Sequence, residues 1–271
     1  MIDLSKISGL PMELDEKTYK LKFKAPMENM VPAVRVFEEM KPVLMDPEAK
    51  PNPDREELYY MYRDVHLPQN EELIRENKIR YDITVIPPCM IGREFVKTVG
   101  HFHSPVPGEA TEIDFPEVYE VLHGQALFMI QKLDHGHSGN IRTIMAIRAS
   151  RGEKVVYPPN YAHIIINIGS DVLVTANWVS SEYTADYKSI SDRHGMGYYV
   201  VEGSDGKQFE IVPNKHYESL PEMRFAQGHM NTSLGFLVDE PMYETGIRHP
   251  GRLEFLNNPH KFAVELSSIT S

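Results

Sequence analysis

TVGHFHSPVPGEATEIDFPEVYEVLHG (residues 98–124) and GEKVVYPPNYAHIIINIG (residues 152–169) carry the pattern that decides the fold. In the first stretch His101 and His103 are separated by one residue, so on a strand both imidazoles point to the same face. Glu117 opens a segment, EVYEVLHG, that is typical of the next strand. If the two strands pair antiparallel, the carboxylate lies opposite the two imidazoles.

The second stretch predicts a hairpin that supplies one more ligand. Residues 158–160 (PPN) form the expected turn, since asparagine tolerates left-handed backbone, and His163 opens the strand that follows. Three imidazoles and a carboxylate suit Fe, Ni, Zn, Mn or Co, and on a six-coordinate ion they leave two positions open. We therefore predict one divalent transition metal per subunit, held by His101, His103, Glu117 and His163.

Short segments rich in β-branched and aromatic residues surround these two stretches, and Gly, Pro, Asn, Asp or Ser bounds each of them. Examples are YDITVIPP (81–88), ALFMIQKL (126–133) and DVLVTANWV (171–179). Many short strands at this spacing predict an antiparallel sandwich or barrel, not a Rossmann sheet.

The remaining segments predict elements that flank this barrel. We expect a strand over 19–24, a helix over 30–44, a hairpin turn at 204–207 (SDGK) and two or three short strands within 235–258. The predicted organisation is an N-terminal extension (1–55), a barrel (56–214) and a C-terminal extension (215–271) that packs on the barrel or on a partner subunit.

Charge and composition narrow the class of protein. With 28 basic and 39 acidic residues, the net charge of −11 argues against binding to nucleic acid or to an anionic membrane. No apolar run approaches the roughly 18 residues that a membrane span needs. The first twenty residues lack the apolar stretch of a secretory signal, and Cys89 is the single cysteine, so we expect a cytoplasmic protein without disulfides.

The spacing HxH…E(x6)G followed by G(x5)P(x4)H(x3)N resembles the two-part signature of the cupins. The matching residues are His101, His103, Glu117, Gly124, Gly152, Pro158, His163 and Asn167. More specifically, TVGHFH, PEVYEVLHG, VVYPPNYAH and NIG resemble the cupin-type glucose-6-phosphate isomerases known from archaea. The resemblance implies an all-β cupin barrel, a double-stranded β-helix or jelly roll, between two terminal extensions. It also implies a homodimeric enzyme of glycolysis and gluconeogenesis.

This resemblance assigns roles to further residues. Besides the four ligands, it implies that Thr84, Thr98 and Gly100 hold the sugar phosphate and that Tyr59, Tyr119 and Tyr187 contact the substrate.

Two positions depart from the family pattern. Val179 and Ala185 stand where the family has a tyrosine and a histidine, and Tyr183 or Trp178 are the nearby residues that could replace them.

The implied reaction interconverts glucose 6-phosphate and fructose 6-phosphate. Glu117 carries a proton between C2 and C1 through a metal-stabilised cis-enediolate, and Tyr119 orients the sugar or moves a hydroxyl proton; a metal-assisted hydride shift is the alternative route. Two other functions stay open, a cupin oxygenase and a non-catalytic cupin that binds a sugar phosphate. The phosphate-holding residues Thr84, Thr98 and Gly100 favour the isomerase over the oxygenase.

Overall fold

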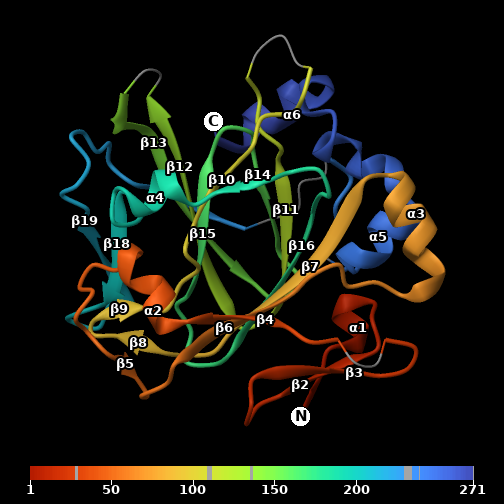
Figure 1. Cartoon of the computed structure of the whole chain (residues 1–271), viewed down its shortest axis with the longest axis horizontal. Helices are drawn as coiled ribbons and strands as arrows, with labels where there is room; N and C mark the ends of the chain where they lie inside the picture. The colour runs from red at the N-terminus through yellow and green to blue at the C-terminus, as the bar shows by residue number, and fades with distance from the viewer. Residues whose placement is uncertain (28–29, 109–111, 135–136, 229–233, 238, 271) are drawn as a thin grey trace.

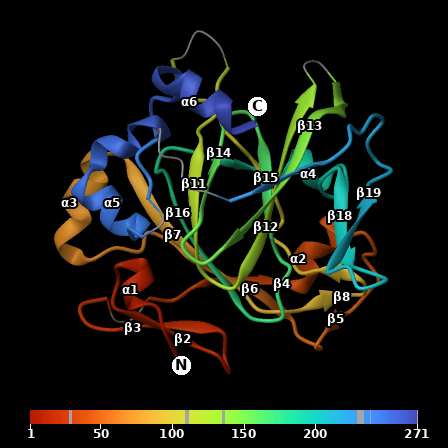
Figure 2. The same ribbon diagram turned by 180° about the vertical axis from the view of Figure 1, so that it is seen from behind.

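The computed structural model describes residues 1–27, 30–108, 112–134, 137–228, 234–237 and 239–270. Two sheets pack face to face and form the barrel (Figures 1 and 2). The six-stranded sheet has the order β14 (Lys154–Tyr157), β11 (Glu117–His123), β16 (Leu173–Ser180), β7 (Ile79–Ile86), β6 (Glu57–Tyr62) and β4 (Ala33–Val36). The four-stranded sheet has the order β15 (Ala162–Asn167), β12 (Gln125–Asp134), β13 (His137–Ser150) and β20 (Arg224–Gln227). All these strands pair antiparallel except β13 and β20, so the predicted all-β cupin barrel is confirmed.

Strand alternation divides the apolar residues of the six-stranded sheet between two cores. On β11, Tyr119 and Val121 face inward and meet β12, β13 and β15 in the barrel core. Val118 and Leu122 face outward into a second core, which the two ends of the chain cover. Both faces of this sheet are therefore buried, and a charged side chain on either face needs a partner.

Two smaller sheets stand at the side of the barrel. One has the order β19 (Phe209–Pro213), β18 (Tyr198–Glu202), β9 (Glu94–Phe95), β8 (Met90–Ile91) and β5 (Pro51–Asn52). The other pairs β10 (Phe102–His103) with β17 (Ala185–Asp186). Because β18 and β19 pair antiparallel on either side of residues 204–207, the predicted hairpin there is confirmed.

The N-terminal segment forms a three-stranded sheet of β1 (Ile2–Asp3), β2 (Met12–Asp15) and β3 (Lys20–Phe23), with α1 (Ser5–Ser8) beside it. The strand predicted over 19–24 is therefore confirmed as β3. The helix predicted over 30–44 is wrong in its first half, because β4 pairs with the edge of β6. Helix forms only at α2 (Phe37–Met40) and continues as the 3-10 turn η1 (Lys41–Val43). The β-branched Val34 and Val36 gain more from the open sheet edge than a short helix offers them.

The C-terminal segment is helical where strands were predicted, so that expectation is wrong for the described residues of 235–258; residue 238 lies outside them. It contains α5 (Met242–Arg248), η4 (Pro250–Leu256), η5 (Pro259–Phe262), α6 (Ala263–Ser267) and η6 (Ser268–Thr270). Helix α6 lies beside residues 112–113 and the turn at 158–161. Helix α5 and the following η4 lie against the outer face of the six-stranded sheet (Figures 1 and 2). That face offers apolar side chains and no free strand edge, so helices cover it better than strands. Helix α5 approaches so closely that a Cβ on Gly246 would lie 2.7 Å from the ring of Trp178.

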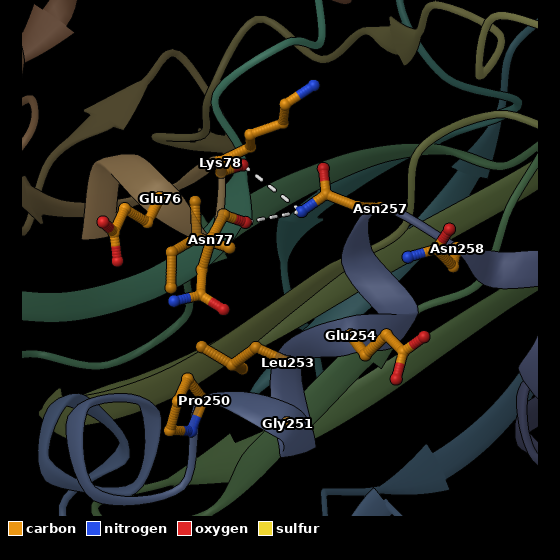
Figure 3. Close-up of a pocket in the computed structure, with 10 residues that line it drawn as sticks. Glu76, Asn77, Lys78, Pro250, Gly251, Leu253, Glu254, Asn257 and Asn258 are labelled. Atoms are coloured by element: carbon orange, nitrogen blue, oxygen red, sulfur yellow. Dashed lines mark hydrogen bonds between the residues drawn. The ribbon is translucent and has the colours of Figure 1, made fainter. Parts of the chain in front are cut away.

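Polar contacts also fix this segment, as Figure 3 shows at the end of η4. Asn257 donates hydrogen bonds to the carbonyl oxygens of Asn77 and Lys78, at 2.9 and 3.4 Å. These carbonyls belong to the turn between α3 (Glu71–Glu76) and β7. The short helix η2 (Pro68–Asn70) precedes α3. The extension therefore belongs to the same folded body as the barrel. Among the described residues, no helix is both long enough and apolar enough to span a membrane.

Candidate metal centre

The four predicted metal ligands come from three different parts of the barrel. His103 lies in the short strand β10, and His101 directly precedes that strand. His101 also forms an isolated antiparallel bridge with His163 on β15 of the four-stranded sheet. Glu117 opens β11 in the six-stranded sheet. Pairing of these segments closes one end of the barrel around the four side chains, which is how residues 62 positions apart meet.

The donor atoms of these side chains converge. One ring nitrogen from each of His101, His103 and His163 lies within 4.8 Å of those of the other two. The Glu117 Oε2 atom is 3.4 Å from Nε2 of His103 and 3.2 Å from Nε2 of His163. The three imidazoles therefore surround a common point, and the Glu117 carboxylate lies against two of them.

Within the described residues, the donor atoms that face this point make no hydrogen bonds. The Nε2 atoms of His101, His103 and His163 and the Oε2 atom of Glu117 are buried and make no hydrogen bond. The outer atoms are satisfied, since the ring Nδ1 of His103 lies 2.8 Å from the carbonyl of Phe115 and Glu117 Oε1 accepts from the amide of Asn177 at 2.5 Å. Buried polar atoms that lack hydrogen bonds are groups that a bound cation would satisfy, so the residues fit a divalent metal.

The protonation states match those that a metal requires. Burial lowers the pKa of His101 well below its usual range, and the nearby His163 and His103 add to this effect. Burial also lowers the pKa of His163, against an opposing effect of Glu117. Burial alone would raise the pKa of Glu117, but its contacts with His103 and His163 outweigh it and lower that pKa. The lowered pKa values of His101 and His163 favour neutral imidazoles, and that of Glu117 favours an ionised carboxylate, which are forms that bind a transition metal.

The side chain of Asn160 connects the turn before His163 to the loop before Glu117. Asn160, where the cupin signature often has glycine, adopts a left-handed φ of +67°. Its side chain accepts a hydrogen bond from the backbone N–H of Asp114 at 2.8 Å and donates one to the carbonyl of Glu112 at 3.1 Å. Asparagine therefore satisfies the turn and adds two bonds that glycine cannot make.

A pocket lies beside these ligands and brings together the six residues expected to bind or process the substrate. Tyr59, Thr84, Thr98, Gly100, Tyr119 and Tyr187 line it together with His101 and His163. The hydroxyl of Tyr59 accepts from the backbone N–H of Val99 and from Nε of Arg35, both at 3.3 Å. The Thr98 hydroxyl accepts from the N–H of Ile165 at 3.0 Å, so its own proton is free to be donated.

The structure also adds residues that the sequence reasoning missed. Arg63 and Met61 line the pocket, as does Tyr183, one of the two residues considered as replacements for the departures. Trp178, the other, faces the second core and donates to the carbonyl of Met242, so that alternative is wrong. Arg63 could have been predicted from strand alternation, because positions 59, 61 and 63 share one face of a strand.

Val179 and Ala185, the two departures, lie next to the ligands. Val179 is fully buried on β16, with Glu117 and Arg80 as its cross-strand neighbours. Ala185 pairs with His103 between β17 and β10. Neither side chain can bind a sugar hydroxyl, and neither lines the pocket, so the polar groups there come from other positions.

Comparison with known proteins extends these observations. The family model described as glucose-6-phosphate isomerase (GPI) matches residues 34–216. The glucose-6-phosphate isomerase of Thermococcus litoralis is 30% identical over 176 residues, which are 65% of this chain and 83% of that protein. The glucose-6-phosphate isomerase of Pyrococcus abyssi is 26% identical over 186 residues, 69% of this chain and 88% of that protein.

Two solved structures match part of this chain. The vicilin of hazelnut (Corylus avellana) has a TM-score of 0.34 and 13% identity, covering 47% of this chain and 32% of that chain. An oxalate oxidase has a TM-score of 0.34 and 17% identity, covering 48% of this chain and 55% of that chain. The family model spans β4 to the end of β19, including all four ligands. This chain belongs to the glucose-6-phosphate isomerase family.

Proposed function

We propose that the protein is a metal-dependent isomerase that interconverts glucose 6-phosphate and fructose 6-phosphate. The observation that carries the proposal is the cluster of three imidazoles, with the Glu117 carboxylate against two of them, beside a pocket lined with hydroxyl groups. Family membership supplies the substrate, since the relatives are named for this activity.

The hydroxyl-bearing end of the pocket suits the phosphate group. Thr84, Thr98 and Tyr187 offer hydroxyls, and Gly100 offers a backbone N–H without a side chain in the way. At Gly100, where φ is +84°, a Cβ would lie 2.5 Å from the side chain of Ile164, so glycine also lets the two strands approach. Neutral donors of this kind bind a phosphate despite the acidic net charge.

At the other end, a divalent transition metal held by His101, His103, Glu117 and His163 would supply Lewis-acid polarisation of the substrate oxygens on C1 and C2. Fe, Ni, Zn, Mn and Co all suit these donors.

Glu117 is the proposed proton carrier, in a state in which binding of the sugar has released its Oε2 atom from the metal. It takes the proton from C2 of the open-chain aldose, and the electron pair of that bond forms the C1–C2 double bond while the carbonyl pair moves onto O1. A proton then passes from O2 to O1, and Glu117 returns its proton to C1 as the C2 carbonyl forms. Asn177 orients the carboxylate through Oε1.

Tyr119 is the proposed relay between O1 and O2. It faces inward two residues after Glu117, and burial raises its pKa well above the usual value, so the hydroxyl stays protonated and able to donate.

A coupled assay on metal-loaded protein tests the proposal with glucose 6-phosphate, mannose 6-phosphate and a chelator control. Turnover that disappears on chelation and returns with added metal supports the isomerase. Oxygen consumption would identify the oxygenase instead, and a thermal shift by sugar phosphate without turnover would identify a binding protein.

Solvent deuterium separates the two chemical routes. Proton transfer through Glu117 exposes the proton to exchange and places deuterium on C1 of fructose 6-phosphate, whereas a hydride shift does not. Glu117→Gln is expected to retain the fold and lose at least about two orders of magnitude in kcat. Near-normal turnover in this variant removes Glu117 from the proton transfer.

The proposal includes a homodimer, as the family resemblance implies. Light scattering coupled to size exclusion measures the mass directly, and a value of about 31 kDa, the mass of one chain, would contradict it.

A further inference from the structure

A buried carboxylate organises two arginines at the metal end of the pocket. The side chain of Asp82, on the inward face of β7, is 1% exposed. Its Oδ2 atom accepts from Nη1 of Arg63 at 2.6 Å and from Nη2 of Arg80 at 2.9 Å, and its Oδ1 atom accepts from the backbone N–H of Asp64 at 2.9 Å. Two guanidinium groups share one carboxylate, so a net positive charge remains here.

Arg63 extends the row of side chains that lines the pocket from β6. Tyr59, Met61 and Arg63 alternate along the chain, and all three contact the same pocket. At about 3.3 Å per residue, the Cα atoms of Tyr59 and Arg63 lie roughly 13 Å apart along the strand. Tyr59 meets Val99 beside the hydroxyl-bearing end, so Arg63 lies toward the opposite end.

Pairing across the six-stranded sheet places the Asp82–Arg63 contact at the level of the reacting groups. Asp82 pairs with Asn177, which pairs in turn with Tyr119 and donates to the Glu117 carboxylate. The ring of Tyr183 packs at 4.2 Å from that of His103, and the guanidinium of Arg80 lies 5.5 Å over the Tyr183 ring.

A guanidinium at this place has a clear chemical use. The Arg63 side chain is 40% exposed. Its Nη1 donates to Asp82, and this fixed partner also sets the orientation of the remaining N–H groups of the guanidinium. A pre-oriented cation in a partly enclosed site stabilises negative charge that develops on a substrate oxygen, and it need not reorganise to do so.

We propose that Arg63 contacts the oxygens of the two reacting carbons and stabilises their negative charge, with Asp82 as its positioning residue. This inference rests on the proposed function, because it assumes a sugar phosphate whose phosphate lies at the Tyr59 end.

Two matched ligands test the proposal by calorimetry on metal-loaded protein. Arabinonate 5-phosphate carries a carboxylate where an enediolate carries its charge, and arabinitol 5-phosphate is neutral at that carbon; the phosphate end is the same in both. Arg63→Gln is expected to weaken the arabinonate about 10- to 100-fold, as expected for a lost charged hydrogen bond, and the arabinitol less than about 3-fold. Equal weakening of both ligands, or of neither, overturns the proposal.

Three further variants make the result specific. Arg63→Lys keeps the charge without the planar fork and should recover part of the arabinonate affinity. Asp82→Asn keeps Arg63 but loosens its orientation, and should lower kcat more than it changes KM. Lys78→Gln removes a charge from an exposed ion pair with Glu182, outside the pocket, and should change neither affinity. Metal content and melting temperature are measured for every variant, so a misfolded protein is recognised.

Failure of this inference and failure of the proposed function give different results. If the unmodified protein binds both ligands but does not turn over glucose 6-phosphate, the isomerase proposal fails. The ligand pair still reports whether Arg63 recognises the charge. If turnover is normal and Arg63→Gln affects both ligands alike, the isomerase stands and Arg63 loses its proposed role.

Discussion

Replacing Lys154 by methionine tests how the C-terminal extension is attached to the barrel. Lys154 and Glu120 form an ion pair of 2.8 Å in which both side chains are 0% exposed, on the outer face of the six-stranded sheet. The same ammonium group donates to the carbonyl oxygens of Leu237 and Glu240, at 2.7 and 3.0 Å. Glu120 in turn accepts from the backbone N–H of Met242 at 2.9 Å, so one pair joins two barrel strands to the start of α5.

The expected cost follows from what the substitution leaves behind. In Lys154→Met the carboxylate of Glu120 stays buried without its cation, and two extension carbonyls lose their donor. Breaking a buried pair in this way costs about 3–5 kcal/mol of unfolding free energy. In the double variant Lys154→Met with Glu120→Gln, the amide still accepts from Met242 and no unpaired charge remains. We expect it to recover at least about 1.5 kcal/mol of that loss.

The pH dependence provides a second signature. Burial raises the pKa of Glu120 to about 7, with Lys154 opposing the shift. A raised pKa in the folded state means that the contribution of this group to stability is present below its unfolded value of 4.5 and is lost as the pH rises through about 7. Without Lys154 the carboxyl binds a proton more readily still, so the loss in Lys154→Met should be smaller at pH 5 than at pH 8.

Urea unfolding followed by two probes measures these effects. Trp178 is the single tryptophan and bonds to Met242 at the start of α5, so its fluorescence reports on the attachment of the extension. Circular dichroism reports on the strands. A loss below 1 kcal/mol in Lys154→Met, or the same loss in the double variant, would refute the reasoning that the ion pair holds the extension.

Three other expectations concern the site and its frame. His163→Ala should lose both bound metal and activity, and it should abolish the metal-induced stabilisation of about 2.7 kcal/mol expected at a metal concentration 100 times Kd; elemental analysis and thermal melts check this. Thr98→Ala should raise KM for glucose 6-phosphate with kcat within about 3-fold, whereas a fall in kcat alone would contradict a phosphate contact. Gly124→Ala should destabilise the fold by about 2 kcal/mol or more in urea titrations, because φ is +83° and the new Cβ would lie 2.6 Å from the carbonyl oxygen of Val172; an unchanged midpoint would show that this turn can relax.

The sequence by itself predicted the barrel, and it predicted residues that the structure brings together at the candidate metal centre. Two imidazoles two residues apart share a strand face whatever the rest of the chain does, and Glu117 and His163 lie at or next to the starts of strands that are visible in the sequence. The hairpin at 204–207 and the strand at 19–24 were predictable for the same reason: each depends on local turn chemistry and period. Local rules work where neighbours in the chain determine the geometry.

Only the tertiary structure decided the features that depend on distant partners. Residues 33–36 became a strand because the edge of β6 was open, and residues 242–248 became a helix because an apolar sheet face needed cover. The orientation of the Arg63 guanidinium is set by its hydrogen bond to Asp82, which is 19 residues away in the sequence. In each case the free energy comes from a contact made only after folding brings remote segments together, so no local pattern in the sequence records it.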